Sequence, residues 1–494
     1  MNKKLVTLAA ILMTVTTACS TGGNKTSGGA SPAPGGSAAA TGGSQPVTLT
    51  IVSKDFQPED ANVQRKVKAI EEAMKADGKN VKLQVLPVQS GTYSEKLGLI
   101  LQSGNIPDLI YFQGGDYNFA ITQKILEDLT PYVDKSTNIK ASLNDYNKER
   151  MKNYPYLLWL SPPISAVPVV RQDILDKAPS GKEAIANPTT DNYYKFFKEL
   201  KEKAGVKYAY TTAGTIDELD SMFGQSFGLT STWIKGADGK YSYGKTTQAE
   251  KEKLDFYAKL YKEGLLDPEF LTKKWDTKEK AFYDGQAGII AGSQGKVIDV
   301  YNTKAISQNG AGAKVVPLPP AKGKAQGYTP VDVSKESRGW AVSKTSKNKD
   351  MAFAVLEYMA GEKGQIIDKI GIEGSEYTMA NGKIKLTDKF AAWYPNFVES
   401  ITNFKAPMDP STPYLTEPAM KSLEMFTSMS TKDNSFVIPS DLASKWDAAN
   451  AVYKEFAANM VTGKKTAADF DKFVADWNAA GGKDVTDYAN KTIK

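Results

Sequence analysis

Apolar residues recur along the chain with two different spacings, and the two spacings alternate. Every second position is apolar over 47–53 (VTLTIVS) and again over much of 81–88, which predicts two strands. Apolar residues recur every three to four positions over 62–76 and 93–103, which predicts two helices. The short apolar run 108–112 (DLIYF) predicts a third, buried strand.

This alternation predicts an α/β fold. Strands that are joined by helices run parallel in one sheet, and the helices cover both of its faces. Ligands bind to such sheets beyond the carboxyl ends of the strands. The loop from Gln113 to Tyr117 follows the predicted strand 108–112, so we expect it at that edge of the sheet.

The rest of the chain repeats the alternation after an interruption. Residues 157–171 are apolar but contain three prolines, and a rigid segment of this kind between two α/β blocks predicts a crossing between domains. An Asn-Gly dipeptide within 377–386 predicts a hairpin. The other predicted helices are 192–203, 217–227, 248–263 and 349–360, the other strands are 208–210, 287–291, 314–318 and 339–342, and the chain from 387 onward is predicted to be mainly helical.

The amino-terminal residues have the pattern of an export signal. Lys3 and Lys4 precede the apolar stretch 5–15, which is too short to cross about 30 Å of hydrocarbon as a helix. Ala18 and then Cys19, the single cysteine of the chain, follow that stretch. This order predicts cleavage by lipoprotein signal peptidase and lipidation of Cys19. Its thiol would carry a diacylglycerol, and palmitate is an expected acyl chain. Two acyl chains anchor a protein stably, so we expect attachment to the outer face of a cell membrane.

A low-complexity segment follows the predicted signal peptide, which is residues 1–19. Residues 20–46 are almost all Gly, Ser, Ala, Thr and Pro, which cannot bury enough apolar surface to fold, so they predict a disordered linker. No later apolar run reaches 18 residues, so no transmembrane helix is predicted. About 450 residues remain after the linker, which is enough for two sizeable domains.

Composition argues against several classes of function. The chain has no histidine and one cysteine, which removes Ser-His-Asp and Cys-His nucleophile pairs and nearly all zinc, nickel and haem sites. The formal net charge of +6 is mild for 494 residues, and no basic stripe for nucleic acid is present. Neither a phosphate-binding GxxxxGK[ST] loop nor an EF-hand loop is found, so we expect no metal and no cofactor. Composition leaves open carboxylate chemistry, as in glycosidases, or calcium and magnesium held by oxygens.

Arginine is rare, at four of the 62 basic residues. Where lysine is the default base, a retained arginine is a candidate for bidentate recognition, although chance or a local salt bridge would also account for it. The four are Arg65, Arg150, Arg171 and Arg338.

Seven segments match, in order, the motifs of one protein family. They are 95–112 (EKLGLILQSGNIPDLIYF), 125–134 (ILEDLTPYVD), 167–177 (VPVVRQDILDK), 260–270 (LYKEGLLDPEF), 282–292 (FYDGQAGIIAG), 339–359 (GWAVSKTSKNKDMAFAVLEYM) and 371–378 (GIEGSEYT). On these segments the chain resembles the extracellular solute-binding proteins of family 1, the maltose-binding-protein-like group. It is most similar to the longer Gram-positive lipoproteins associated with oligosaccharide uptake. The resemblance covers nearly all of the chain after the linker.

The resemblance implies a periplasmic-binding-protein-like fold, in which two α/β lobes are joined by a hinge and hold a solute in the cleft between them. It implies a binding subunit of an ABC importer rather than an enzyme, a monomer that delivers an oligosaccharide to membrane permease subunits. The chain of this family crosses between the lobes more than once. We therefore expect lobe one at 47–165 plus 318–375, and lobe two at 166–317 plus 376–494.

A sugar site requires aromatic faces beside polar groups. Trp233 lies in a loop rich in Gly, Ser and Thr, whereas Trp446 and Trp477 lie at helical spacing and are interpreted as core. By analogy with the family, Asp116 and Tyr117 are candidates for hydroxyl bonding and stacking. The complete set of expected ligand contacts is Asp116, Tyr117, Trp233, Trp275, Ser293, Arg338, Trp340, Glu373 and Tyr377.

Packing is the alternative for each of these tryptophans, and Glu373 and Tyr377 could instead brace the predicted hairpin. Arg171 and Asp173 match an Arg-x-Asp of the family, but they could simply anchor the start of lobe two. Two alternatives to oligosaccharide capture remain at this point. The same fold could bind a peptide, a polyamine or an anion, or the chain could be a surface glycosidase that uses two carboxylates.

Overall fold

The computed structural model describes residues 45–88, 93–113, 124–161, 163–329, 338–394, 397 and 406–493. The predictions for Cys19, Asp116 and Tyr117 lie outside these residues. Within them, no helix combines the length and the apolar composition that crossing a bilayer requires.

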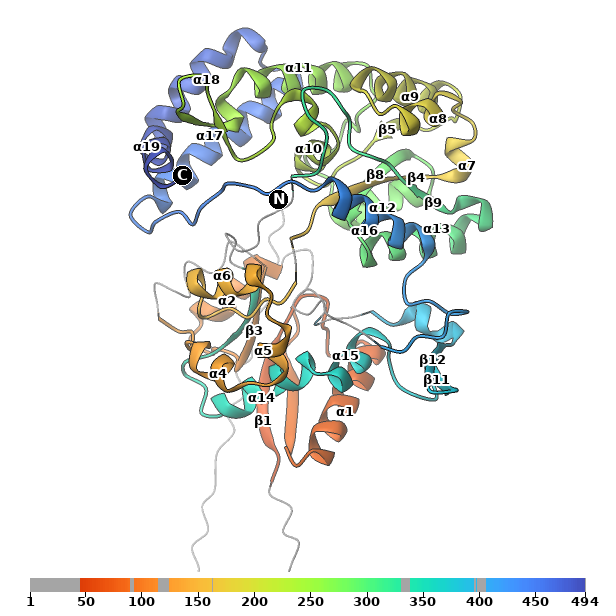
Figure 1. Ribbon diagram of the computed structural model, residues 1–494, viewed down its shortest axis with the longest axis vertical. Coiled ribbons are helices and arrows are strands. Elements are labelled where there is room, and N and C mark those ends of the chain that lie inside the picture. Colours follow the sequence, from red (N-terminus) through yellow and green to blue (C-terminus); the bar gives the residue numbers. More distant parts are fainter. Residues whose placement is uncertain are drawn as a thin grey trace, which may run out of the picture. The chain divides into compact units, whose positions relative to one another are not determined.

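The first sheet has four strands in the order β10-β3-β1-β2 (Figure 1). As predicted, β1 runs parallel to both β2 and β3, and the antiparallel β10 adds an edge. Val47 lies opposite Val81 in the register of β1 and β2. The strands are β1 (Val47–Val52), β2 (Val81–Val85), β3 (Leu109–Gln113) and β10 (Arg338–Val342).

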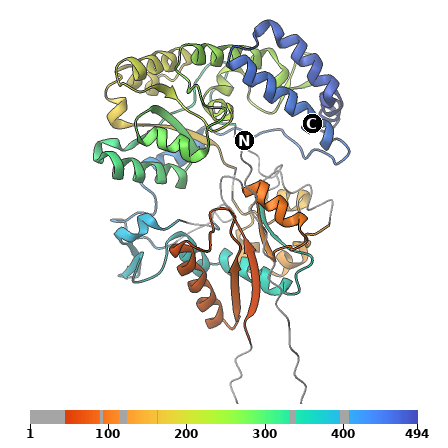
Figure 2. The same cartoon turned by 180° about the vertical axis from the view of Figure 1, so that it is seen from behind.

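Helices pack around this sheet to form the first core. In α1, the Asp60 side chain accepts the backbone N–H groups of Asn62 and Val63 and so caps the helix. Ile70 and Met74 of α1 are fully buried, and the helix lies along β2 (Figure 2). The helices are α1 (Ala61–Ala76), α2 (Tyr93–Gln102), α4 (Thr130–Lys135), α5 (Asn138–Ser142), α6 (Asp145–Asn153), α14 (Lys349–Ala360) and α15 (Glu362–Lys369).

The second sheet also has four strands, in the order β5-β8-β4-β9. Here the prediction of a parallel sheet is wrong in part, because only β5 and β8 run parallel, whereas β4 is antiparallel to β8 and β9. The proline-broken run 157–171 contributes β4. Within the described residues, no crossover helix of the second sheet precedes β4, so nothing requires β4 to run parallel to its neighbours. The strands are β4 (Ala166–Arg171), β5 (Tyr208–Tyr210), β8 (Ala287–Ser293) and β9 (Val315–Pro317).

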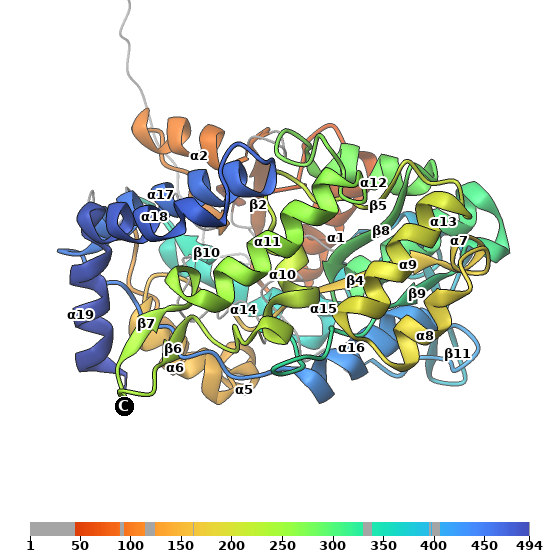
Figure 3. The same ribbon diagram turned by 90° about the horizontal axis from the view of Figure 1, so that it is seen from above.

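The second core forms around this sheet. Both α12 and α13 pack on β8 (Figure 3). Arg171, at the end of β4, binds both carboxylate oxygens of Asp173 and donates to the carbonyl of Tyr283 at 2.7 Å, so this pair has structural partners. The helices before β9 are α7 (Gln172–Leu175), α8 (Ser180–Ala186), α9 (Thr190–Glu202), α10 (Asp217–Phe223), α11 (Gln248–Lys262), α12 (Trp275–Tyr283) and α13 (Lys296–Asn309).

The carboxyl-terminal part is helical apart from the segment between α16 and α17, and its last three helices join the second core. Trp477 of α18 is buried and stacks on Tyr243, with the ring centroids 5.3 Å apart. Trp446 of α17 is half-buried and packs edge-on against Tyr243, so the prediction of a core position is confirmed for Trp477, whereas Trp446 lies at the margin of the core. The helices are α16 (Glu417–Met429), α17 (Ala443–Val461), α18 (Phe470–Trp477) and α19 (Lys483–Thr492).

Two hairpins stand outside the sheets. The pair β11 (Tyr377–Ala380) and β12 (Lys383–Leu386) turns at Asn381 and Gly382, whose φ angles are +52° and +72°. Two successive positive φ values are those that the Asn-Gly signal predicts. The other hairpin, β6 (Trp233–Lys235) with β7 (Tyr241–Tyr243), was predicted as loop.

A buried ionic network lies inside the second core. The ammonium of Lys253 lies 2.6 Å from Asp220 and 2.9 Å from Glu250, and Lys245 also binds Asp220. Tyr257 and Tyr453 donate their hydroxyls to Asp220 and Glu250, at 2.9 and 2.7 Å. Burial alone would raise the pKa of the Asp220 carboxyl, but the two ammonium groups outweigh burial and lower it to about 2.

Candidate functional site

The carboxyl edge of the second sheet gathers several segments. The parallel strands β5 and β8 end there at Tyr210 and Ser293, and the antiparallel β4 begins there, with Ala166 opposite Ser293. Ser293 is half-buried. Next to it, Gln294 accepts the backbone N–H of Ser165 at 3.0 Å and so ties the segment that leads into β4 to this edge. This is the edge at which sheets of this kind bind ligands.

Trp275 presents an exposed indole at the start of α12. Its side chain is 46% exposed, which is unusual for the largest apolar side chain. The ring is nevertheless held in place, because its Nε1 donates to Glu279 at 2.6 Å, one turn further along the helix. Glu279 in turn accepts from Lys304 at 3.1 Å. The result is an aromatic surface of fixed orientation in contact with solvent.

A buried lysine supports that ring. The Nζ of Lys278 lies 3.5 Å from the centroid of the Trp275 ring, within the range of a cation–π interaction. The same Nζ is 2.9 Å from both carboxylate oxygens of Glu218 and 2.9 Å from the carbonyl of Ala291 in β8. Burial lowers the pKa of Lys278 and raises the pKa of Glu218, and the attraction between the two groups opposes both shifts.

A cavity of about 550 Å³ opens beside Trp275. Asp267, which is fully buried behind it, accepts the hydroxyl of Thr211 at 2.6 Å and binds Lys273, also at 2.6 Å. Burial would lower the pKa of Lys273, but its bonds to Asp267 and Tyr208 outweigh burial and raise it. Ala213, Gly214, Leu271, Thr272, Lys273, Lys274 and Trp275 line the cavity.

Two predicted residues lie on β10 of the first sheet. Arg338 is half-buried and pairs with Gln113 at the carboxyl end of β3, and its carbonyl accepts a hydrogen bond from Arg150. Trp340 is 1% exposed and stacks on Phe397, with the ring centroids 4.8 Å apart, so its ring faces are packed as in a core. Arg338 therefore lies at the carboxyl end of β3, and Trp340 is packed in the first core.

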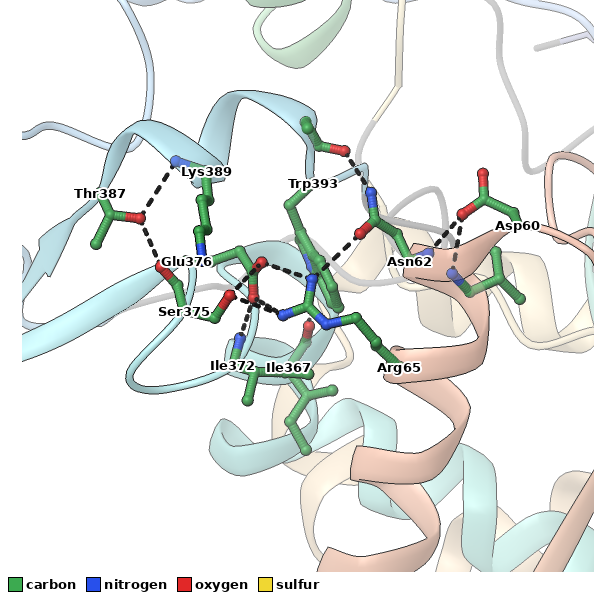
Figure 4. A network of polar contacts seen from close by, with 12 residues as sticks. Asp60, Asn62, Arg65, Ile367, Ile372, Ser375, Glu376, Thr387, Lys389 and Trp393 are labelled. Carbon is green, nitrogen blue, oxygen red and sulfur yellow. Dashed lines mark hydrogen bonds and ion pairs between the residues drawn. The ribbon is translucent and has the colours of Figure 1, made fainter.

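The GIEGSEYT segment has a bracing role in the structure (Figure 4). Arg65 of α1 donates to both carboxylate oxygens of Glu376 at 2.9 Å and to Ser375 at 2.9 Å. Glu373 is exposed, and Tyr377 is 9% exposed at the start of β11. Glu376, which was not predicted, is thus the residue that fastens the hairpin to α1.

The same attachment continues further along the chain. Arg65 and Lys66 both lie over the ring of Trp393, at 5.4 and 5.0 Å from its centroid. The Trp393 Nε1 donates to the carbonyl of Asp368 at 2.9 Å, and Lys66 binds the carboxylate of Asp368 at 2.9 Å. Residues 376–393 are therefore attached to the first core.

Trp233 is a core residue in the structure and not an exposed one. The residue begins β6, and its side chain is 2% exposed. The ring stacks on Phe436, with the centroids 5.5 Å apart, and contacts Tyr243 and Trp446. The composition of the surrounding loop favoured exposure, but aromatic partners about 200 residues later in the chain cover the ring. Of the predicted aromatic contacts that the structure describes, Trp275 alone is exposed.

The residues that sequence reasoning missed are those that support Trp275. Lys278 follows Trp275 at the i+3 spacing, which places two helical side chains on one face, so this signal was available. Glu218 and Asp267 come from other elements, and no local pattern marks them. In the part of the chain that the structure describes, no group of three or more acidic residues is arranged to hold a metal ion.

Solved structures share this fold. The chain aligns with the alginate-binding protein AlgQ2 at a TM-score of 0.68 and 18% identity, over 91% of this chain and 98% of that one. It aligns with the N-glycan transport solute-binding protein NgtS of Streptococcus pneumoniae, in complex with Man5GlcNAc, at 0.63 and 14% identity, over 90% and 97%. The fold is that of the two-lobed, periplasmic-binding-protein-like solute-binding proteins.

The sequence comparison identifies the family. The chain belongs to the bacterial extracellular solute-binding proteins, whose sequence model matches residues 53–366. Two relatives come from Bacillus subtilis (strain 168), each 23% identical to this chain. Lipoprotein LipO matches over 90% of this chain and 92% of its own length, and the polygalacturonan/rhamnogalacturonan-binding protein YtcQ over 84% and 86%. The family is one of solute-binding proteins, and YtcQ and AlgQ2 are named as binding proteins for polygalacturonan or rhamnogalacturonan and for alginate.

Proposed function

We propose that this chain captures an oligosaccharide between two lobes and delivers it to the permease of an ABC importer. The family supports solute binding, and the names of YtcQ, AlgQ2 and NgtS support a carbohydrate as the solute. A monomer with a small-molecule ligand and permease subunits as partners is the assembly that this role requires.

The exposed ring of Trp275 is the observation that carries this proposal. Sugars present flat C–H faces, and an indole offers a large rigid surface for them at little cost in conformational entropy. The ring is fixed by Lys278 and Glu279 before any ligand arrives, so binding loses little further freedom. The neighbouring cavity has room for about one or two sugar rings.

The remaining proposed ligand contacts lie at the two sheet edges and in the segments that follow them. Ser293 is at the edge of the second sheet and Arg338 at that of the first, where Asp116 and Tyr117 follow β3 in sequence. Glu373 and Tyr377 are proposed as peripheral contacts. Trp233 and Trp340 are left out of this set because their rings are packed in the cores.

The two lobes in this proposal correspond to the two sheets and their cores. Lobe one would comprise 47–165 with the later segment around β10, and lobe two 166–317 with the carboxyl-terminal helices. The contacts of Glu376 and Trp393 with α1 support a last crossing further along the chain than residue 375. The anchor would be an acylated Cys19, joined to the lobes by residues 20–46, as the name of LipO also suggests.

A ligand panel tests the proposal. The full chain, solubilised in detergent, would be melted in the presence of oligosaccharides, monosaccharides, peptides and polyamines. A ligand at 100 times its Kd stabilises by about 2.7 kcal/mol, which shifts the melting temperature by several degrees at most. A shift with one class of oligosaccharide supports the proposal. A shift with peptides or polyamines alone would overturn the proposal that the solute is an oligosaccharide. New reducing ends released from a glycan would favour a glycosidase.

A further inference from the structure

The cavity beside Trp275 has a lining of one charge sign. Of its seven lining residues, Lys273 and Lys274 are the charged ones, and no carboxylate is among them. Leu271, which is 42% exposed, and Trp275 supply the apolar part of the lining. A ligand in this cavity therefore meets apolar surface and ammonium groups together.

Three carboxylates that contact lining residues or their supports are engaged by cations of the protein. Glu218 binds Lys278 through both oxygens, and Asp267 binds Lys273 at 2.6 Å. Glu279 accepts from Trp275 and from Lys304. Because these carboxylates are neutralised by partners within the protein, they repel a negatively charged ligand only weakly.

Lys274 remains available. Its side chain is exposed, and the buried ion pair of this segment belongs to Lys273 and not to Lys274. The lysine immediately precedes α12, so the positive end of the helix dipole lies beside it. Asp276 in the first turn opposes this field in part, although its Oδ1 accepts the N–H of Thr277 and the residue does not line the cavity.

We propose that this cavity takes an acidic sugar, a uronic acid residue, with its carboxylate on Lys274 and its apolar face on Trp275. This inference rests on the proposed function and narrows it from oligosaccharides in general to uronate-containing ones. An ammonium and a carboxylate form a charge-assisted hydrogen bond, which a neutral sugar cannot make. The affinity for the acid also falls with added salt, because the pair is near the surface.

Matched pairs of ligands test the inference. Oligogalacturonates, oligomannuronates and oligoglucuronates would each be titrated calorimetrically against their methyl esters, which have the same skeleton without the charge. The full chain in detergent is expected to bind one acid about threefold to fivefold more tightly than its ester. Lys274→Gln is expected to lower the affinity for the acid to that for its ester and so to remove the preference. Lys280→Gln, on the same helix and paired with Asp284, is the matched control and keeps the preference.

The failures of the two proposals are distinguishable. If a neutral oligosaccharide or an ester binds as tightly as every acid, the uronate inference is overturned while oligosaccharide capture stands. The same holds if Lys274→Gln keeps the full preference for the acid. If no sugar of either charge binds, the proposed function itself fails, and the uronate inference fails with it.

Discussion

Arg65 and Glu376 are 311 residues apart in the sequence, yet the guanidinium binds both carboxylate oxygens at 2.9 Å (Figure 4). The carboxylate is buried, at 2% exposure, and the arginine side chain is 38% exposed. A fork that matches two oxygens at once is the reason to retain arginine in a chain where lysine is the default base. This pair fastens the hairpin of β11 and β12 to α1.

Replacing Arg65 with Met is expected to destabilise the fold. The buried Glu376 carboxylate would lose its main partner, which costs about 1–3 kcal/mol of unfolding free energy. Urea titration followed by circular dichroism measures the loss. Lys68→Met on the same helix is the control, because Lys68 and Glu72 are both exposed and such a pair contributes about 0–1 kcal/mol. Equal losses in the two variants would contradict a structural role for the Arg65 fork.

The Asp220 network predicts a specific dependence of stability on pH. The pKa of Asp220 in the folded chain, about 2, lies below the ordinary aspartate value of 3.8, which the unfolded chain has. The stabilisation, on the order of 2 kcal/mol, is therefore complete above pH 4 and is lost as the pH falls from about 4 to 2. Asp220→Asn is expected to be less stable at pH 7 and to show a shallower fall over that window. Asp487→Asn, which removes an exposed partner of Lys483, should retain the steep fall of the unmodified chain.

Two tryptophans are expected to respond in opposite ways to truncation. Trp275→Ala removes a half-exposed ring, so we expect a stability loss of about 1–2 kcal/mol, mainly from the Lys278 cation–π contact, and at least a tenfold loss of oligosaccharide affinity. Trp233→Ala empties part of the second core and should cost about 3–5 kcal/mol of stability. At a temperature where it remains folded, its affinity should be unchanged. Loss of affinity in Trp233→Ala alone would instead place the ligand on Trp233.

The lysine beneath Trp275 is expected to act as a positioning residue. Lys278→Met leaves the Glu218 carboxylate without its cation, which costs about 3–5 kcal/mol for a buried pair. Adding Glu218→Gln removes the orphaned charge and should restore most of that stability. The double variant should still bind the ligand more weakly, because the ring has lost a cation–π contact of about 1–2 kcal/mol. Full recovery of affinity together with stability would show that Lys278 acts on folding alone.

The proposed anchor is tested by changing one atom. Cys19→Ser is expected to move the chain from the membrane fraction to the medium of a Gram-positive host, because two acyl chains are what hold it. Metabolic labelling with an alkyne fatty acid should mark the unmodified chain and not the variant. Ser20→Ala is the neighbouring control. Retention of the variant on the membrane would contradict lipid anchoring.

Local sequence signals predicted those parts of the fold that depend on neighbouring residues. The helix 349–360 was predicted with the bounds that α14 has, and Asn381-Gly382 turns the hairpin as expected. The hairpin of β6 and β7 was missed because each strand has three residues and glycine and serine surround them. The direction of β4 depends on where the chain enters the second sheet, which no local pattern encodes.

The candidate site was predictable in the same limited sense. Trp275 was among the expected contacts, but its exposure is set by tertiary packing, which no local pattern encodes. Trp233 was misjudged for the converse reason, since Phe436 and Trp446 cover it from far along the sequence. Buried supports such as Glu218 are fixed by tertiary packing, so a single sequence cannot single them out among the chain's 56 acidic residues.

The contrast between Trp275 and the other indoles gives the protein an internal optical reporter. Of the seven tryptophans, five are almost fully buried, Trp446 is half-buried, and Trp275 is 46% exposed. Emission at the red edge of the fluorescence spectrum, and its quenching by iodide, will therefore come mainly from one side chain. Because that side chain lies at the proposed sugar surface, a ligand that covers it would shift the emission to the blue and shield it from the quencher. Binding could thus be followed without a label.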